Sequence, residues 1–213
     1  KISFSVNLFG MFYKDQLVPT GELSDVGYPI MTNVEKSYRT GIEMTAGIKP
    51  FSFVNWTLGG TISRNKILVF TEYYINYNTN DWSEQYTGNY IGLTDIAYSP
   101  EFTGMSDLNI NFTKTLGFHF ISKYVGSQYS DNTMDPVRKL SPYFVNNLRF
   151  DFNPDPGKMR SIRLQLLINN LFNVKYESNA YGGNWYEDGI EKSWAYYFPQ
   201  AGTNFLVRLE LGF

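Results

Sequence analysis

The sequence has no cysteine and only one histidine, His119, among its 213 residues. The absence of cysteine rules out disulfides and thiolate metal sites. With a single histidine, a histidine-based metal site or a catalytic triad would need unusual partners, so we expect no metal site, no cofactor and no catalytic site. An excess of positive charge is also lacking, since the net charge is -2. The chain therefore has no general electrostatic reason to bind nucleic acid.

Strong helix formers are scarce as well. Alanine occurs five times, whereas asparagine occurs twenty times and aromatic residues make up 18% of the chain. This composition argues against an all-α protein. No stretch approaches the roughly 18 apolar residues of a membrane-spanning helix, but a membrane barrel stays open because its strands are only half apolar. The chain begins at Lys1 inside an alternating pattern, and we interpret it as a processed piece or a fragment.

What the sequence does contain is alternation of apolar and polar residues with a period of two, which predicts strands with one apolar face. In the last strand, every second residue from Phe205 to Phe213 is apolar, and seven similar segments precede it. Lipid is expected to contact the even-numbered residues of 38–48 and 162–168, and the odd-numbered residues of 205–213. The eight predicted antiparallel strands cover about residues 1–16, 35–49, 54–72, 95–115, 117–130, 138–153, 159–181 and 199–213.

The connections between these strands alternate in length. Short turns at 49–53, 115–117 and 153–157 alternate with long polar loops at about 15–35, 73–94, 130–138 and 182–199. Short turns at one end and long loops at the other are typical of outer-membrane barrels. We therefore predict an all-β fold, a transmembrane antiparallel up-and-down β-barrel surrounded by outer-membrane lipid, with residues 1–213 forming one portion of it.

A soluble β-sandwich would also alternate, but three features argue against it. The predicted strands reach ten or more residues, whereas strands of soluble proteins have about five or six. Aromatic residues gather at the strand ends, as in the interfacial girdles of a membrane barrel. The polar face carries Asn, Ser, Thr and Gly more than Lys and Glu, which suits a lumen better than a soluble surface.

Five motifs occur in a fixed order along the chain. They are YKDQL at residues 13–17, KSYRTGIE at 36–43, YVGSQY followed by DNT at 124–133, INNLFNVKY at 168–176, and FPQAGTNF at 198–205. Together with the terminal Phe213, they resemble the motifs of TonB-dependent outer-membrane receptors, and the third is similar to the version found in Bacteroidota. Thr203 departs from the family pattern, which usually has arginine there. The resemblance covers nearly the whole chain, and the order and spacing make it specific.

The resemblance implies the C-terminal portion of a 22-stranded barrel that encloses an N-terminal plug, with the plug and the TonB box outside this chain. It also implies TonB-dependent active uptake of a scarce or large ligand, foremost a ferric siderophore. Phe213 would be the signal read by the barrel-assembly machinery. Asn169, Asn170 and Asn173 are expected to satisfy backbone groups where the strand bends.

Four alternatives stay open. Eight strands could close a small barrel unaided. The protein could be a non-transporting barrel with a structural or adhesive role, or a TonB-dependent importer of a glycan or a peptide. An outer-membrane enzyme is the fourth, but it would need a catalytic histidine at the loop end. The position of His119 places that residue near the short turns, so we interpret it as structural.

The long loops at 73–94 and 182–199 are rich in aromatic residues. We take Trp82, Tyr86, Trp185 and Tyr186 as candidate ligand-binding residues, because aromatic faces bind sugars, aromatic siderophores and apolar peptide side chains. The alternative is that these loops pack on each other and form a lid.

Two arginines are the candidates for binding an anionic ligand. Arg39 and Arg149 are expected to point into the lumen near the loop side, where a guanidinium would meet a carboxylate of a ferric siderophore. Pairing with Glu43, with Asp151 or with carboxylates of the plug is the alternative, and it is the commoner arrangement for arginines in a lumen.

Overall fold

The computed structural model describes residues 1–23, 26, 28–155, 157 and 160–213. These residues form thirteen β-strands and one short 3₁₀-helix, which confirms the all-β prediction. In the described part, no helix has the length and apolarity that crossing a membrane requires. The elements are β1 (Ile2–Leu23), β2 (Pro29–Ile48), β3 (Val54–Tyr77), β4 (Glu84–Asp95), β5 (Phe102–Asn111), β6 (Leu116–Val125), β7 (Gln128–Tyr129), η1 (Pro136–Arg138), β8 (Lys139–Leu140), β9 (Tyr143–Phe152), β10 (Ser161–Asn169), β11 (Glu177–Glu187), β12 (Ile190–Pro199) and β13 (Asn204–Gly212).

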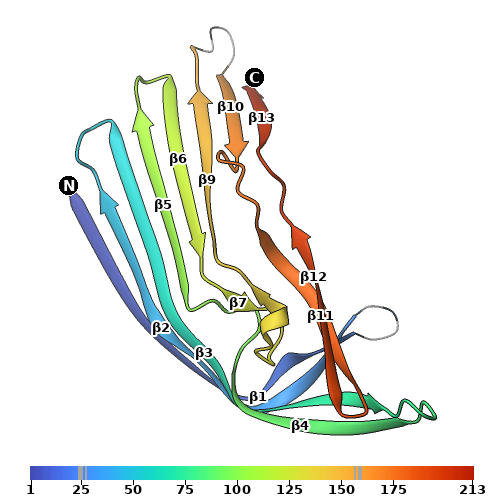
Figure 1. The fold of residues 1–213 in the computed structure, drawn as a ribbon. Coiled ribbons are helices and arrows are strands. Elements are labelled where there is room, and N and C mark those ends of the chain that lie inside the picture. Colours follow the sequence, from blue (N-terminus) through green and yellow to red (C-terminus); the bar gives the residue numbers. More distant parts are fainter. Residues whose placement is uncertain (24–25, 27, 156, 158–159) are drawn as a thin grey trace.

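Eight strands form one continuous wall in the order β1-β2-β3-β5-β6-β9-β10-β13. All neighbours in the wall are antiparallel, as predicted. Figure 1 shows a curved sheet with the tight turns at one end and the longer excursions at the other. Because β1 pairs only with β2 and β13 only with β10, the wall is open within the described residues. The alternative that eight strands close a small barrel is therefore wrong.

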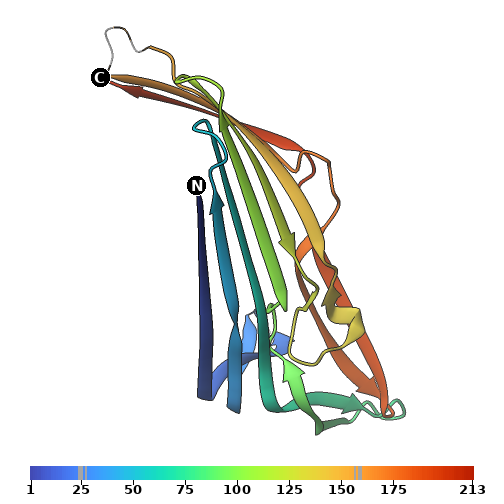
Figure 2. The same ribbon diagram turned by 90° about the vertical axis from the view of Figure 1, so that its left-hand side faces the viewer.

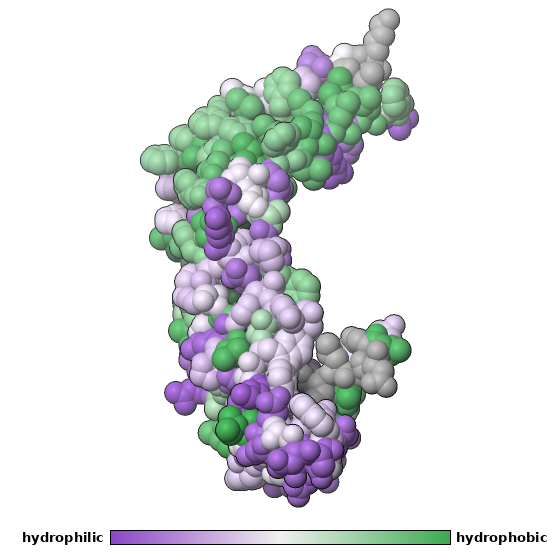
Figure 3. All heavy atoms as spheres, turned by 45° about the vertical axis from the view of Figure 1, so that its right-hand side comes forward, coloured by the Kyte–Doolittle hydropathy of each residue, from purple (hydrophilic) through white to green (hydrophobic). Residues whose placement is uncertain are grey.

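The register places the apolar side chains of the wall on one face. Cross-strand partners lie on the same face of a sheet, and Leu164 pairs with Leu209 on one side and with Phe152 on the other. At the opposite edge of the wall, Ile48 pairs with Ile2. Figure 3 shows the hydrophobic side chains gathered over the end with the short turns, while the opposite end is polar. The expected lipid-facing positions thus belong to one continuous surface.

The height of this surface fits a membrane. The apolar positions of β1 run from Ile2 to Phe12, which is about 33 Å along a strand and about 25 Å in height after a tilt of roughly 40°. Aromatic pairs lie at both borders. The rings of Phe51 and Phe53 stack 5.5 Å apart at the end with the short turns, and those of Phe12 and Tyr38 lie 6.4 Å apart near the other border. This agrees with two interfacial girdles.

Several predicted boundaries were wrong at the loop end. The expected strand 95–115 begins only at Phe102, and the expected strand 159–181 ends at Asn169, after which β11 starts as a separate strand. Most of the expected loops 15–35, 73–94 and 182–199 are strands, and residue 138 belongs to η1 rather than to a strand. Tyr and Thr favour strands even where no apolar face develops, so alternation alone missed these segments.

The loop-end strands form a second region, built on extensions of the wall. Beyond Ile67, β3 leaves β2 and pairs with β4, and its last residues pair in parallel with β11, where Asn76 lies opposite Tyr186. Figure 2 shows these extensions reaching across the loop end of the wall. We call residues 68–77, β4, residues 126–142 and the β11–β12 hairpin the distal cap.

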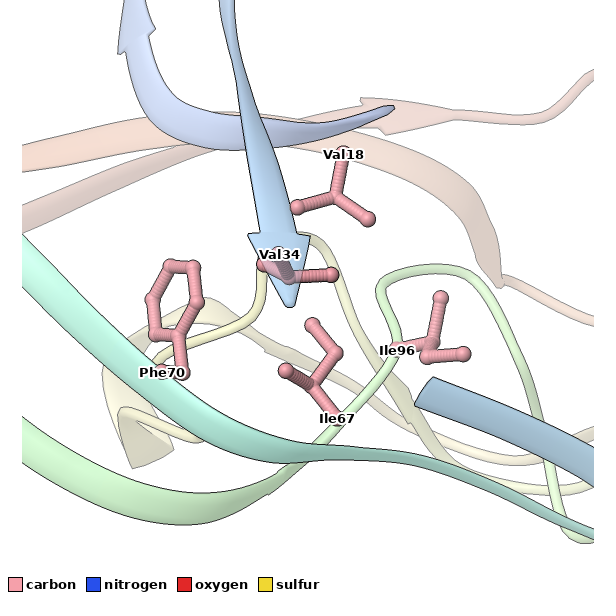
Figure 4. Close-up of a cluster of buried hydrophobic side chains, with 5 residues drawn as sticks. All are labelled: Val18, Val34, Ile67, Phe70 and Ile96. Atoms are coloured by element: carbon pink, nitrogen blue, oxygen red, sulfur yellow. The ribbon is translucent and has the colours of Figure 1, made fainter. Parts of the chain in front are cut away.

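A small hydrophobic core joins the distal cap to the wall. Val18, Val34, Ile67, Phe70 and Ile96 are all buried, and they come from the ends of β1 and β2, from β3 and from the residue after β4 (Figure 4). The wall turns its apolar side chains outward, so this cluster is where hydrophobic side chains of different elements meet away from that face. It fixes where the distal cap departs from the wall.

Candidate functional site

Two of the sequence motifs meet where β10 and β13 give way to β11 and β12. The Asn170 side chain accepts a hydrogen bond from Val174 N (2.9 Å) and donates to the carbonyls of Val174 (2.8 Å) and Ala201 (3.2 Å). Thr203 donates its hydroxyl to Asn170 O (2.8 Å) and its amide to Asn173 Oδ1 (3.2 Å). The prediction that asparagines satisfy backbone groups at a bend is confirmed for Asn170 and Asn173, and Thr203 contributes to the same bend. It is wrong for Asn169, whose side chain donates to Asn204 Oδ1 (3.0 Å) instead.

A third motif holds the distal cap to the wall through Asn132, which is fully buried. Its side-chain amide accepts a hydrogen bond from Ala97 N (2.8 Å) and donates one to Pro19 O (2.6 Å). Its backbone carbonyl accepts a hydrogen bond from Thr94 Oγ1 (2.5 Å). One asparagine therefore connects the segment after β6 to β1 and to the end of β4. Because the buried amide is satisfied, we expect it to contribute to stability.

The buried centre of the distal cap is Arg138, whose side chain is 1% exposed. Its guanidinium forms an ion pair with Asp131, lies 3.2 Å from Asp135 Oδ2 through Nε, and lies 3.6 Å from Glu72 Oε1 through Nη2. Sequence reasoning did not single out this residue. The carboxylates at positions 131 and 135, just before an arginine inside an otherwise polar loop, were the only available signal.

The environment shifts the acidity of two of these carboxyl groups in opposite directions. Burial raises the pKa of Glu72, and the nearby Arg138 only partly offsets this. Burial acts in the same direction on Asp135, but hydrogen bonds from Ser193 Oγ and Val137 N, together with Arg138, lower the pKa of Asp135 below its ordinary value. The two groups therefore differ because Asp135 receives more donors.

Among the candidate aromatic residues, Tyr186 is packed inside the distal cap. Its ring stacks on Tyr74 with the centroids 3.8 Å apart. Burial, followed by the carboxylates of Glu191 and Glu72, raises the pKa of Tyr186 to about 12. For Tyr186 the structure agrees with the alternative, in which the two aromatic segments pack on each other.

The other three aromatic candidates have different surroundings from Tyr186. Trp185 alternates with Tyr186 along β11, and its indole donates to Glu187 Oε1 (2.9 Å). Tyr86 stacks on Tyr73 at 5.5 Å, and Trp82 lies in the β3–β4 turn with a positive φ of 57°. Trp82 and Tyr86 are each 68% exposed. The structure thus separates the four residues into a packed ring at Tyr186, a half-buried ring at Trp185 and two exposed rings at Trp82 and Tyr86.

Arg39 lies in the middle of β2 on the polar face of the wall. Its Nη1 donates to Ser99 Oγ (2.9 Å) and approaches Asn65 Oδ1 at 3.4 Å. The expected alternative partner Glu43 accepts instead from Asn7 Nδ2 at 3.1 Å. Among the described residues, no carboxylate lies within ion-pair distance of Arg39. It is held in place by neutral groups, and its charge is not offset.

The structure corrects the position of Arg149. It was expected near the loop side, but it lies close to the end of β9 that leads into a short turn, opposite His119. Its Nε donates to Asp151 Oδ2 at 3.0 Å, which is the alternative pairing named from the sequence. His119 lies 3.0 Å from Asp107 and 3.4 Å from Asp151, so its expected structural role at this end is supported by geometry.

The single histidine of the chain belongs to the wall and not to the distal cap. In the described part of the chain, no group of three or more His, Asp or Glu side chains is arranged to hold a metal ion. His119 is surrounded by carboxylates and the amide of Asn109, far along the wall from the distal cap. What remains is the polar face of the wall, where Arg39 has no carboxylate at ion-pair distance among the described residues, leading to a distal cap that displays exposed aromatic rings.

Comparison with known proteins gives a family and a fold. The sequence matches the family model for the TonB dependent receptor-like beta-barrel over residues 1–171. Among solved structures, the chain resembles the ferric-catecholate import receptor Fiu from K12 E. coli, with a TM-score of 0.62, 17% identity, and coverage of 100% of this chain and 25% of that one. No curated protein matches the sequence.

Two further solved structures show the same likeness. The ferric yersiniabactin uptake receptor FyuA from Yersinia pestis has a TM-score of 0.65 and 18% identity, with 100% of this chain and 28% of that chain covered. A ferric enterobactin receptor mutant (PfeA) from Pseudomonas aeruginosa, in complex with enterobactin, has a TM-score of 0.63 and 17% identity, with 100% and 29% covered.

At these identities the structural likeness shows the fold alone, and the chain spans between 25% and 29% of the length of these receptors. The family match, in contrast, covers most of the sequence. The chain therefore belongs to the TonB-dependent receptor-like β-barrel family, whose members lie in the outer membrane of Gram-negative bacteria.

Proposed function

We propose that the full-length protein imports a ferric siderophore across the outer membrane in a step that depends on TonB. The family match supports TonB-dependent uptake, and the structural neighbours named above are receptors for a ferric catecholate, ferric yersiniabactin and ferric enterobactin. TonB would act through a part of the protein outside this chain. The barrel-assembly machinery would act through β13, and the ligand would enter from the side of the distal cap.

The main support for an anionic ligand is the environment of Arg39. Its guanidinium faces the polar side of the wall, is fixed by Ser99 and Asn65, and has no carboxylate at ion-pair distance among the described residues. A fixed, uncompensated guanidinium suits a carboxylate or catecholate oxygen. Arg149 is already paired with Asp151 and contributes less to the proposal. Trp82 and Tyr86 would offer aromatic contacts at the entrance.

The test is growth of a deletion strain under iron limitation, combined with uptake of iron-55 siderophores. We expect a growth defect that plasmid-borne wild type restores, and loss of uptake when TonB is absent. Arg39→Gln should lower uptake at limiting ligand, whereas Arg208→Gln, at an exposed arginine already beside Glu210, should not. Normal growth under iron limitation would reject the iron proposal.

A glycan or peptide ligand is the second candidate, because the exposed rings would also stack on sugars. The rings of Tyr181, Trp194, Tyr196 and Phe198 form a contiguous group on the β11–β12 hairpin. A growth defect on one glycan or peptide source, with none under iron limitation, would select this candidate. If no nutrient gave a defect and the gene encoded no plug, a non-transporting barrel would replace both.

A further inference from the structure

Arg138 connects three parts of the distal cap that are far apart in the sequence. Its carboxylate partners are Glu72 on β3 and Asp131 and Asp135 in the segment before η1. Asp135 also accepts a hydrogen bond from Ser193 of β12. A second contact runs beside it, because Tyr197 of β12 donates to the carbonyl of Val137 at 2.5 Å.

The charges at this site do not balance. One guanidinium faces three carboxylates, and the exposed fractions of the side chains are 1% for Arg138, 6% for Glu72, 5% for Asp131 and 14% for Asp135. If all three acids were ionised, two negative charges would remain uncompensated in a region of low dielectric, which is unfavourable. A buried cluster of this kind is relieved when one acid binds a proton.

The geometry identifies Glu72 as the acid that takes the proton. Asp131 accepts from the amide and the hydroxyl of Thr133 at 3.0 and 2.8 Å, in addition to its ion pair. Asp135 accepts from Val137 N at 2.9 Å and from the hydroxyl of Ser193. Glu72 has the longest of the three contacts with Arg138, at 3.6 Å, and only one further donor in the described part of the chain, the side chain of Asn184. It is therefore the carboxylate whose charge is least compensated.

We propose that Arg138 is a positioning residue that clamps β3 and the β11–β12 hairpin to residues 131–138, and that protonation of Glu72 tightens this clamp. The consequence is a distal cap whose packing depends on pH. The clamp fixes the stacked pair of Tyr74 and Tyr186, and with it the outer face of the same strands that carries the exposed rings. The proposal does not depend on which ligand the receptor imports.

The groups around Glu72 act on its charge in opposite directions, and burial is the largest influence. Burial, Asp131 from the neighbouring segment and Glu191 from β12 disfavour its ionised form, whereas Arg138 and a hydrogen bond from Asn184 of β11 favour it. The raised pKa of Glu72 agrees with this geometry. Because the packed state binds the proton more tightly than the open state, packing is strongest at low pH and weakens as pH rises through the raised pKa.

The test is hydrogen exchange of the full-length receptor in detergent, without ligand, between about pH 5 and pH 8. The measured quantity is the protection factor of peptides from residues 69–77 and 177–199. It is the ratio of the intrinsic to the observed exchange rate at the same pH, so the intrinsic pH dependence of exchange cancels. In the wild type, protection should fall with rising pH, by a factor of about ten for each pKa unit that separates the packed state from the open state. Peptides from β5 and β6 should show no such trend.

Two variants and one control decide the outcome. Glu72→Gln should keep the cap protected and abolish the pH trend, because the amide cannot ionise. Arg138→Met should lower protection at every pH, since it leaves the buried carboxylates without their cation. Glu43→Gln, which alters a polar-face carboxylate of the wall, should behave as wild type.

Glu72→Gln is the deciding variant, since Arg138→Met can also prevent assembly. If Glu72→Gln kept the wild-type pH trend, or if β5 and β6 followed the same trend as the cap, the proposal would be overturned.

Discussion

The wall and the distal cap are stabilised in opposite ways. The wall places its apolar side chains outside and connects its polar side chains in rows, such as Gln165 with Asp151 at 2.5 Å. The distal cap buries aliphatic side chains such as Leu140, together with ions and amides such as Arg138 and Asn132, and exposes rings such as Tyr86. Apolar side chains thus face outward in the wall, as in a membrane barrel, and inward in the distal cap, as in a soluble protein.

The difference shows what each region needs in order to hold its shape. The wall depends on hydrogen-bonded ladders and on the lipid, which accepts any apolar side chain of moderate size. The distal cap depends on specific partners, and each of them can be lost by one substitution. Four experiments test this contrast, in order of decreasing expected effect.

The largest effect is expected in the aliphatic core of the junction. Ile67→Ala removes a fully buried side chain and should cost about 2–5 kcal/mol. The loss should open the distal cap while the wall stays folded, and hydrogen exchange of peptides from β4 and from the loop ends of β1 and β2 would measure it. Ile62→Ala lies five residues earlier in the same strand at a 53% exposed, lipid-facing position. Equal opening by both variants would contradict the contrast.

The next effect concerns the facing of the wall. Leu164→Arg puts a charge on the apolar face and should cost about 2–4 kcal/mol near the membrane midplane. Gln165→Arg should cost far less, because position 165 lies on the polar face beside Asp151. The measurement is reversible unfolding from lipid into denaturant. Comparable losses for the two neighbours would show that the faces are assigned wrongly.

A third experiment separates assembly from stability. Phe213 is 80% exposed at the end of β13, and contact with lipid is worth no more than the burial of one phenylalanine, about 1.5–3 kcal/mol. We expect deletion of Phe213 to reduce the assembled barrel by more than this loss explains, as judged from outer-membrane levels. Phe205→Ala, at a similarly exposed ring of the same strand, is the control. Normal outer-membrane levels of the deletion variant would show that Phe213 is not an assembly signal.

The smallest effect is expected at the bend between the regions. Asn170→Ala should cost about 1–3 kcal/mol, because backbone groups at a buried bend lose their partners. Asn170 also has a positive φ of 48°, so Asn170→Gly separates the two causes. Glycine tolerates this φ but cannot form the hydrogen bonds. Exchange of residues 177–199 should rise in both variants, and full rescue by glycine would assign the effect to the backbone alone.

The sequence was sufficient to predict the wall. Lipid demands an apolar side chain at every second position, so the strands and their faces can be recognised without knowing any partner. The same reasoning placed His119 correctly by face and depth. It assigned Arg149 to the correct face but to the wrong end, because alternation reports the side of a strand and not the height along the barrel.

The distal cap could not be predicted in this way. Neighbouring aromatic residues such as Tyr73 and Tyr74, or Trp185 and Tyr186, point to opposite faces, so both faces look alike and the period of two disappears. The partner of Arg138 on β3 is 66 residues away in sequence, from position 138 to position 72. No local sequence pattern predicts such a pair, so Arg138 could not be distinguished from other polar residues of its loop.

The long-range pairing of β3 with β11 has a consequence for folding kinetics. In the wall, each strand pairs with strands close to it in the chain, so its ladders can form in order. The contact between Asn76 and Tyr186 must close a loop of 110 residues, from position 76 to position 186. Loops of this length close slowly, because their entropy is lost before the contact is gained. The distal cap should therefore be the last part to form, and until β11 arrives the last residues of β3, Asn76 and Tyr77, present an unpaired strand edge to chaperones and to other chains.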